Sequence, residues 1–177
     1  LDLSQRMYAG DIKPSRLVRA RYKIADILRQ RKDGLSALVV YSGDAFTVTP
    51  LTHDTATIES QLSSLSPNIM PSSGKNTAAA LAQAVDLLQQ AGQQQGRILL
   101  VSDGVNKDSI EQLANISAAY RLSVVGVAST EGAPVKLAGG GFLKDTGGNI
   151  LVPKLDRSTL ALLASKGNGV YTTISDN

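Results

Sequence analysis

Three short polar segments, each beside an apolar run, carry the side chains whose chemistry stands out. They supply six candidates: Asp2, Ser4, Arg6, Lys75, Thr77 and Asp103. Carboxylates and hydroxyls are oxygen ligands that suit Mg²⁺, which takes about six oxygens in an octahedral array. Arginine and lysine instead form charge-assisted hydrogen bonds with carboxylates. The residue types therefore indicate either a metal site or a metal-free cluster of ion pairs.

The elements around these segments alternate between strands and helices. Apolar runs at 35–41, 97–101 and 122–128 are bounded by turn residues, as is typical of strands buried on both faces. Helical spacing follows Pro14, which suits a first helical turn, and follows Asp54, which suits an N-cap. The same spacing recurs over three further ranges: 77–90, 109–120 and 158–166.

This order predicts an α/β fold with a mostly parallel central sheet of five or six strands and helices on both faces. Residues 1–177 fit a single domain. Glycine-rich turns predict a β-hairpin insertion near 131–153. Ligands of such sheets bind at the carboxyl ends of the strands. We therefore expect the three polar segments to meet at that edge.

Composition excludes several classes of function. The net charge of +3 is too small to indicate nucleic-acid binding, and no run is long enough to span a membrane. The chain has no cysteine, and His53 is its single histidine, so a zinc site is not expected. Gly74 and Lys75 do not complete a phosphate-binding loop, and no Gly-x-Ser-x-Gly nucleophile motif is present. We do not expect an enzyme.

The three segments resemble the metal-ion-dependent adhesion site of the von Willebrand factor type A (vWA) family. Asp2-Leu-Ser4-Gln-Arg6 is similar to that family's Asp-x-Ser-x-Ser loop, and Ser102-Asp103-Gly104 to its (Ser/Thr)-Asp-Gly turn. Two positions depart from the pattern: Arg6 replaces the second serine, and Lys75 replaces the threonine after Gly74. Thr77 matches only if its loop shifts in register. A bound Mg²⁺ would keep Asp2, Ser4 and Asp103 as its ligands.

Further stretches resemble the vWA domains of the bacterial Bat (Bacteroides aerotolerance) group, among them 11–17, 43–46, 50–54, 70–71, 132–134 and 141–145. That resemblance implies the soluble, periplasmic domain of a protein anchored in the inner membrane by segments outside this chain. It implies protein partners, namely other vWA proteins and an AAA-type ATPase. It also implies the strand order 3-2-1-4-5-6. The first strand is truncated here, because Leu1 directly precedes Asp2, so either upstream residues of a longer protein or a neighbouring chain would supply it.

We hypothesise that Arg6 and Lys75 supply the positive charge of the missing ion, so that the site is a metal-free cluster in a protein-interaction module. The alternative is a Mg²⁺-dependent module whose ion is completed by an acidic residue of a partner. An α/β hydrolase-like enzyme ranks last because the nucleophile motif is missing, and Asp2 and Asp103 more often mark a former metal site or helix caps than a catalytic carboxylate pair. Seven basic residues at 16–32 predict a solvated helix face or, alternatively, a surface for acidic lipids or partners.

Overall fold

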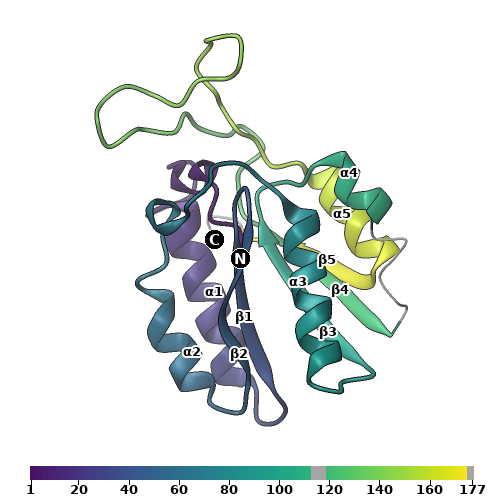
Figure 1. The fold of residues 1–177 in the computed structure, drawn as a ribbon. Helices are drawn as coiled ribbons and strands as arrows, with labels where there is room; N and C mark the ends of the chain where they lie inside the picture. The colour runs from purple at the N-terminus through teal and green to yellow at the C-terminus, as the bar shows by residue number, and fades with distance from the viewer. Residues whose placement is uncertain (113–118, 175–177) are drawn as a thin grey trace.

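The computed structural model describes residues 1–112 and 119–174. Within these residues the elements are, in chain order, η1 (Gln5–Tyr8), α1 (Arg16–Gln30), β1 (Ser36–Tyr41), β2 (Ala45–Thr52), α2 (Thr55–Leu62), η2 (Pro67–Ile69), α3 (Thr77–Gln90), β3 (Gly96–Ser102), α4 (Lys107–Gln112), β4 (Tyr120–Gly126), α5 (Arg157–Lys166) and β5 (Asn168–Thr173). The predicted α/β class is confirmed (Figure 1). The fold also contains strands β2 and β5, which the sequence patterns did not locate.

The strands form two groups that the N-terminal residues join. β1 pairs with β2 in antiparallel fashion, whereas β3, β4 and β5 are parallel. Between the groups, the Asp2 N–H donates to the Val101 carbonyl at 3.0 Å, and the Leu3 N–H donates to the Tyr41 carbonyl at 2.7 Å. The order across the molecule is therefore β2, β1, residues 1–3, β3, β4 and β5. Residues 1–3 lie where the implied strand order puts the first strand.

Two hydrophobic clusters lie on opposite faces of the strands. Side chains alternate between faces along a strand, so adjacent β3 residues divide: Leu100 belongs to one cluster and Val101 to the other. Helices α1 and α2 cover the Val101 side, and α3 and α5 cover the Leu100 side (Figure 1). The result is a three-layer arrangement in which leucine, valine, isoleucine and alanine supply most of the core.

Polar side chains fix where the helices begin. Asp54 accepts a hydrogen bond from the Thr57 N–H, so the predicted cap of α2 is confirmed. Helix α1 begins two residues later than predicted, at Arg16 instead of Pro14, because Ser15 is its N-cap. The helix predicted at 109–120 begins at Lys107, its residues 113–118 lie outside the described residues, and Tyr120 belongs to β4.

The predicted hairpin near 131–153 is present as a long excursion at one end of the molecule (Figure 1). Its backbone makes isolated antiparallel bridges, Lys136 with Phe142 and Lys144 with Ile150, in place of continuous strands. The Asp145 carboxylate accepts N–H bonds from Gly147 and Asn149 and so closes the second turn. Turns and a few cross-chain backbone hydrogen bonds, such as Leu143 N–H to the Val135 carbonyl, therefore hold the excursion.

No helix in the described part of the chain has the length and hydrophobicity needed to cross a bilayer.

Candidate functional site

Four of the six predicted site residues converge at the carboxyl ends of the strands. Asp2 sits between Tyr41 of β1 and Val101 of β3, Asp103 directly follows β3, and Lys75 precedes α3. Both carboxylates are fully buried. Arg6 reaches the Asp103 carboxylate from η1. The expectation that these loops meet is correct.

The Lys75 ammonium lies between the two carboxylates. Its Nζ is 2.7 Å from Asp2 Oδ2 and also contacts Asp103 Oδ1. It further donates to Ser102 Oγ at 3.3 Å and to the Gly104 carbonyl at 3.2 Å. The Lys75 side chain is only 8% exposed. A buried cation is thus surrounded by oxygen atoms from two segments of the chain, at Asp2 and at 102–104.

Two guanidinium groups share the other oxygen of Asp103. Arg6 Nε and Arg16 Nη1 each lie 2.8 Å from Asp103 Oδ2. Arg16 also holds both oxygens of Asp11, at 2.7 and 2.8 Å, and donates to the Pro153 carbonyl at 2.6 Å. Arg16 is fully buried, whereas the Arg6 side chain is 32% exposed. Arg6 is therefore the cation of this group that a partner can touch.

The cluster is balanced in charge. It contains three carboxylates and three cations: Asp2, Asp11, Asp103, Arg6, Arg16 and Lys75. Buried charges are tolerated when they are paired and their hydrogen-bonding capacity is used. The hydroxyl of Ser102 contributes by donating to Asp2 Oδ2 at 2.7 Å. The arrangement is an ion-pair network at the edge where ligands of this kind of sheet bind.

These contacts hold two carboxylates in their ionised form. Burial alone raises the pKa of Asp2, but the attraction and hydrogen bond of Lys75, with those of Ser102 and the Ser4 N–H, outweigh it, so the pKa is lowered. Burial likewise opposes ionisation of Asp11, and hydrogen bonds from Arg16 and from the Ser129 backbone lower its pKa below the ordinary value.

The two predicted hydroxyl residues lie at the margin of the cluster. The Ser4 N–H donates to Asp2 Oδ1 at 2.7 Å, while its buried Oγ has no hydrogen-bond partner. Thr77 is buried as the first residue of α3 and donates to the Tyr41 hydroxyl at 3.4 Å. Burial raises the pKa of Tyr41 well above its usual value. Thr77 does not join the carboxylates.

Arg16 is the functional residue that sequence reasoning misplaced. We predicted it on a solvated basic face, and that prediction is wrong. The signal was present, because Arg16 precedes Ala20, Ile24 and Leu28 at four-residue intervals and so shares the apolar face of α1. Asp11 was also missed, since a carboxylate in a loop has no periodic pattern to mark it.

Other members of the basic stretch are also engaged in contacts. Arg21 donates to the Leu65 carbonyl, and Arg29 pairs with Glu59. Arg31 donates to the carbonyls of Asp33 and Leu35. These contacts fix α1 against α2 and the following turn, and they leave less of the stretch for an acidic surface than the sequence suggested.

The oxygen atoms of the site do not form the ligand set that a divalent ion needs. A magnesium site requires about six oxygens around one open centre. Here Lys75 Nζ stands between Asp2 and Asp103, and the described residues contain no group of three or more histidine, cysteine, aspartate or glutamate side chains suited to a metal. With the ammonium in this place, the residues present do not fit a divalent cation.

Known proteins resemble this chain in both sequence and fold. The family model for the von Willebrand factor type A domain matches residues 1–106. An aerotolerance-related membrane protein of Bacteroides fragilis, solved with multiple mutations to serines, is 28% identical with a TM-score of 0.90, and the match covers 99% of this chain and 89% of that one. The conserved hypothetical protein BatB of Bacteroides thetaiotaomicron is 29% identical with a TM-score of 0.89, covering 99% and 88%.

A more distant structure shares the fold alone. Proximal thread matrix protein 1 of the mussel byssus, described with a zinc-occupied MIDAS motif, is 18% identical with a TM-score of 0.52. That match covers 96% of this chain and 40% of the mussel chain. No curated protein matches the chain.

Replacing Arg16 tests how much the ion-pair network contributes to the free energy of unfolding. We expect Arg16→Met to lower the free energy of unfolding by about 3–5 kcal/mol, because it leaves the Asp11 carboxylate without its cation and removes one of the three cations that bind Asp103. Lys23→Met, on an exposed position of the same helix, is the control and should change it by less than about 0.5 kcal/mol. Urea unfolding measures both variants, and equal effects would contradict the assigned role of Arg16.

The lowered pKa of Asp11 predicts how the stability of the fold decreases at acidic pH. Asp11 stabilises the fold above its ordinary pKa of 3.8, and this contribution is lost as the pH falls through the lowered folded-state pKa. Asp11→Asn should therefore be less stable than wild type at pH 7, and the two should converge as the pH approaches the lowered value. The comparison uses the urea unfolding midpoints of wild type and Asp11→Asn, measured from pH 7 downwards. A difference between the two midpoints that stays constant with pH would refute the stabilising role of ionised Asp11.

Proposed function

Because the chain belongs to the von Willebrand factor type A domain family, we propose that it is a protein-interaction module whose strand-end site works without a bridging metal ion. The observation that carries the proposal is the position of the Lys75 ammonium between Asp2 and Asp103. In this reading, the ammonium supplies the positive charge that a divalent cation would otherwise supply.

Electrostatics supports the exclusion of an added ion. Three cations already neutralise three carboxylates, so a divalent ion would bring surplus positive charge into a buried site. It would also have to displace an ammonium that is covalently tethered beside its oxygen ligands. The zinc described for the mussel protein belongs to that protein, and we propose that this chain has replaced such an ion with side chains.

One observation favours the metal-dependent alternative. Ser4 Oγ is buried, lacks a hydrogen-bond partner and follows Asp2 by two residues. An unsatisfied buried hydroxyl costs free energy, and an ion beside Asp2 would satisfy it. This alternative requires Lys75 to leave its present position, since its Nζ lies 2.7 Å from Asp2 Oδ2. A hydrolase-like role has less support, because the chain has no Gly-x-Ser-x-Gly nucleophile motif.

Metal titration separates the two readings. We expect isothermal calorimetry with Mg²⁺ and Mn²⁺ to show no binding by wild type and measurable binding by the double variant Arg6→Ser, Lys75→Thr, because the substitutions remove two cations and restore two hydroxyls. Lys23→Thr is the matched control and should remain silent. Circular dichroism checks that each variant is folded. Saturable binding by wild type would overturn the metal-free site.

We further propose that the partners are other vWA proteins and an AAA-type ATPase, and that the domain works on the periplasmic face of an inner membrane to which its parent protein is anchored. The Bacteroides fragilis relative is described as an aerotolerance-related membrane protein, which supports the membrane association. Arg6 and the neighbouring loops are the accessible parts of the site and are the surface that such partners would contact.

Site-directed crosslinking tests the interaction surface. A photoreactive amino acid at exposed Gln5, beside Arg6, should crosslink the domain to a protein partner in isolated membranes, with the same yield in EDTA as in Mg²⁺. The same group at exposed Gln94, before β3 at the opposite end of the sheet, is the control and should give no such product. A product that disappears in EDTA, or that forms equally from both positions, would contradict the proposal.

A further inference from the structure

The excursion at 131–153 is folded as a small ribbon of three extended segments, 135–137, 141–145 and 149–151. The middle segment has a neighbour on each side. The Leu143 N–H donates to the first segment at 2.9 Å, and the Leu143 carbonyl accepts from the Leu151 N–H of the third at 2.8 Å. The ribbon therefore has two faces, as a sheet has.

Four side chains share one face of this ribbon. Residues that lie opposite each other in an antiparallel pair point to the same face, as do residues two apart along one segment. The isolated bridges place Lys136 opposite Phe142 and Lys144 opposite Ile150. Because Phe142 and Lys144 are two residues apart, all four side chains lie together. We call them the exposed face of the excursion.

The opposite face of the ribbon supplies the packing that the excursion needs. Val135, Leu143 and Leu151 alternate with the residues of the exposed face and so point to the other side. Val135 is fully buried, and Leu143 and Leu151 are half-buried. Folding of the excursion thus accounts for the apolar residues on this side and leaves those of the exposed face without a role.

The exposed face combines apolar side chains with unpaired cations. Ile150 is 51% exposed, and Val152, two residues farther along, is 42% exposed. Phe142 is half-buried, whereas Lys136 and Lys144 are exposed. Neither lysine forms an ion pair with any residue that the structure describes. A contiguous apolar patch on a protein surface often marks a contact with a partner or a membrane.

The carboxylate nearest in sequence does not neutralise these lysines. Asp145 lies two residues after Leu143, so it belongs to the opposite face. Its carboxylate accepts hydrogen bonds from the N–H groups of Gly147 and Asn149 in the second turn. The exposed face is therefore positively charged, and it complements a surface with acidic groups outside and apolar groups beneath.

A bilayer that contains acidic lipids is such a surface. Lysine side chains extend to the headgroup phosphates while neighbouring apolar side chains enter the interfacial region. A specific protein interface of standard size needs about 20–30 residues from each partner, many more than the exposed face contains. The excursion also projects from one end of the molecule, where a flat surface can reach it (Figure 1).

We propose that the exposed face of the excursion docks on an anionic lipid bilayer. Phe142 and Ile150 enter the interfacial region, and Lys136 and Lys144 contact headgroup phosphates. This contact is separate from the ion-pair cluster, and it does not depend on the protein partners proposed above. Because the Pro153 carbonyl at the base of the excursion accepts from Arg16, docking places the strand-end site beside the membrane surface.

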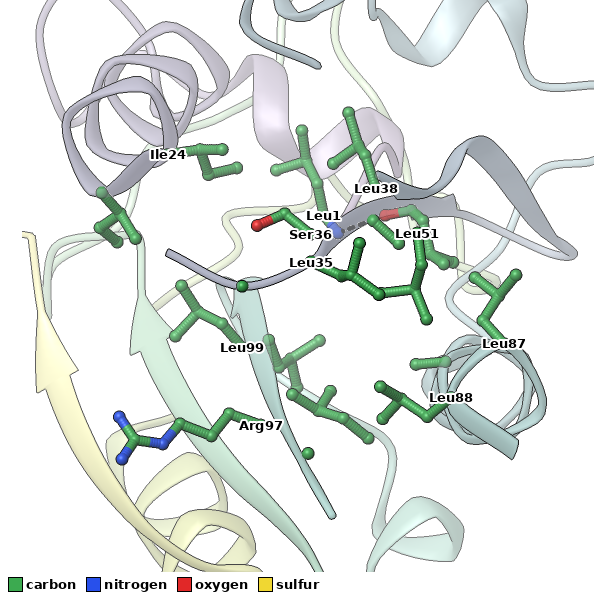
Figure 2. A pocket seen from close by; sticks show the side chains of 18 of the residues that line it. Leu1, Ile24, Leu35, Ser36, Leu38, Leu51, Leu87, Leu88, Arg97 and Leu99 are labelled. Atoms are coloured by element: carbon green, nitrogen blue, oxygen red, sulfur yellow. Dashed lines mark hydrogen bonds between the residues drawn. The ribbon is translucent and has the colours of Figure 1, made fainter. Parts of the chain in front are cut away.

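Tryptophan fluorescence tests the contact, because the chain contains no tryptophan of its own. We expect the emission of Phe142→Trp to shift to shorter wavelength, and to be quenched by lipids with brominated chains, on vesicles of phosphatidylglycerol and phosphatidylcholine in equal parts. Leu99→Trp, at a β3 side chain that is 38% exposed, is the matched control and should not respond (Figure 2). Unchanged emission of Phe142→Trp on these vesicles would overturn the proposal.

Co-sedimentation of the untagged chain with the same vesicles tests the two lysines. The double variant Lys136→Gln, Lys144→Gln should partition roughly twentyfold more weakly than wild type, since each lysine near an anionic surface contributes about a fivefold factor. The control Arg97→Gln, Arg121→Gln removes two exposed cations near the amino ends of β3 and β4 (Figure 2). It should bind as wild type does. Equal losses in the two double variants would contradict docking through the excursion.

A third variant tests the apolar side chains and the choice of occupant. Phe142→Ser, Ile150→Ser should lose vesicle binding, and full retention of binding would overturn the proposal. If this variant does not fold by circular dichroism, the lysine variants, which alter no apolar contact, decide the outcome. An emission shift of Phe142→Trp that needs no vesicles and grows with protein concentration would assign the face to a second copy of the chain, which would also overturn the proposal.

Discussion

The functional end of the molecule depends on the ion pairs that the Asp103 carboxylate forms. One of its oxygens binds Lys75, and the other binds both Arg6 and Arg16. These cations come from the loop before α3, from η1 and from α1. A fully buried carboxylate must be neutralised by neighbours, so the three segments are held at one point. The converging strand ends provide that point, and the helices set the direction from which each cation approaches.

The same network reaches the excursion at 131–153. Arg16 donates to the Pro153 carbonyl, and its partner Asp11 accepts from the Ser129 N–H and hydroxyl. Both ends of the excursion are thereby tied to the buried cluster. The excursion carries exposed apolar residues, among them Leu137, Ile150 and Val152. Its base is thus hydrogen-bonded to the ion pairs, while its tip extends away from the body of the molecule (Figure 1).

Sequence patterns predicted the layered fold and the meeting of Asp2, Arg6, Lys75 and Asp103, because apolar runs mark buried strands and loops at their carboxyl ends share an edge. They did not reveal Asp11, whose position depends on tertiary packing. Arg16 was assigned by its charge to a solvated face, although its spacing places it on the buried one. Strand β5 escaped notice since its residues alternate between exposed and half-buried, which leaves no continuous apolar run.

The tethered ammonium of Lys75 has a consequence for control. A side chain is present in every copy of the protein, whereas occupancy by a free ion follows its concentration. Under the proposed function, the docking surface is therefore complete as soon as the chain has folded, and it offers the cell no ionic on–off signal. The timing of complex formation must then reside in the supply and placement of the partners, and the domain behaves as a constitutive receptor.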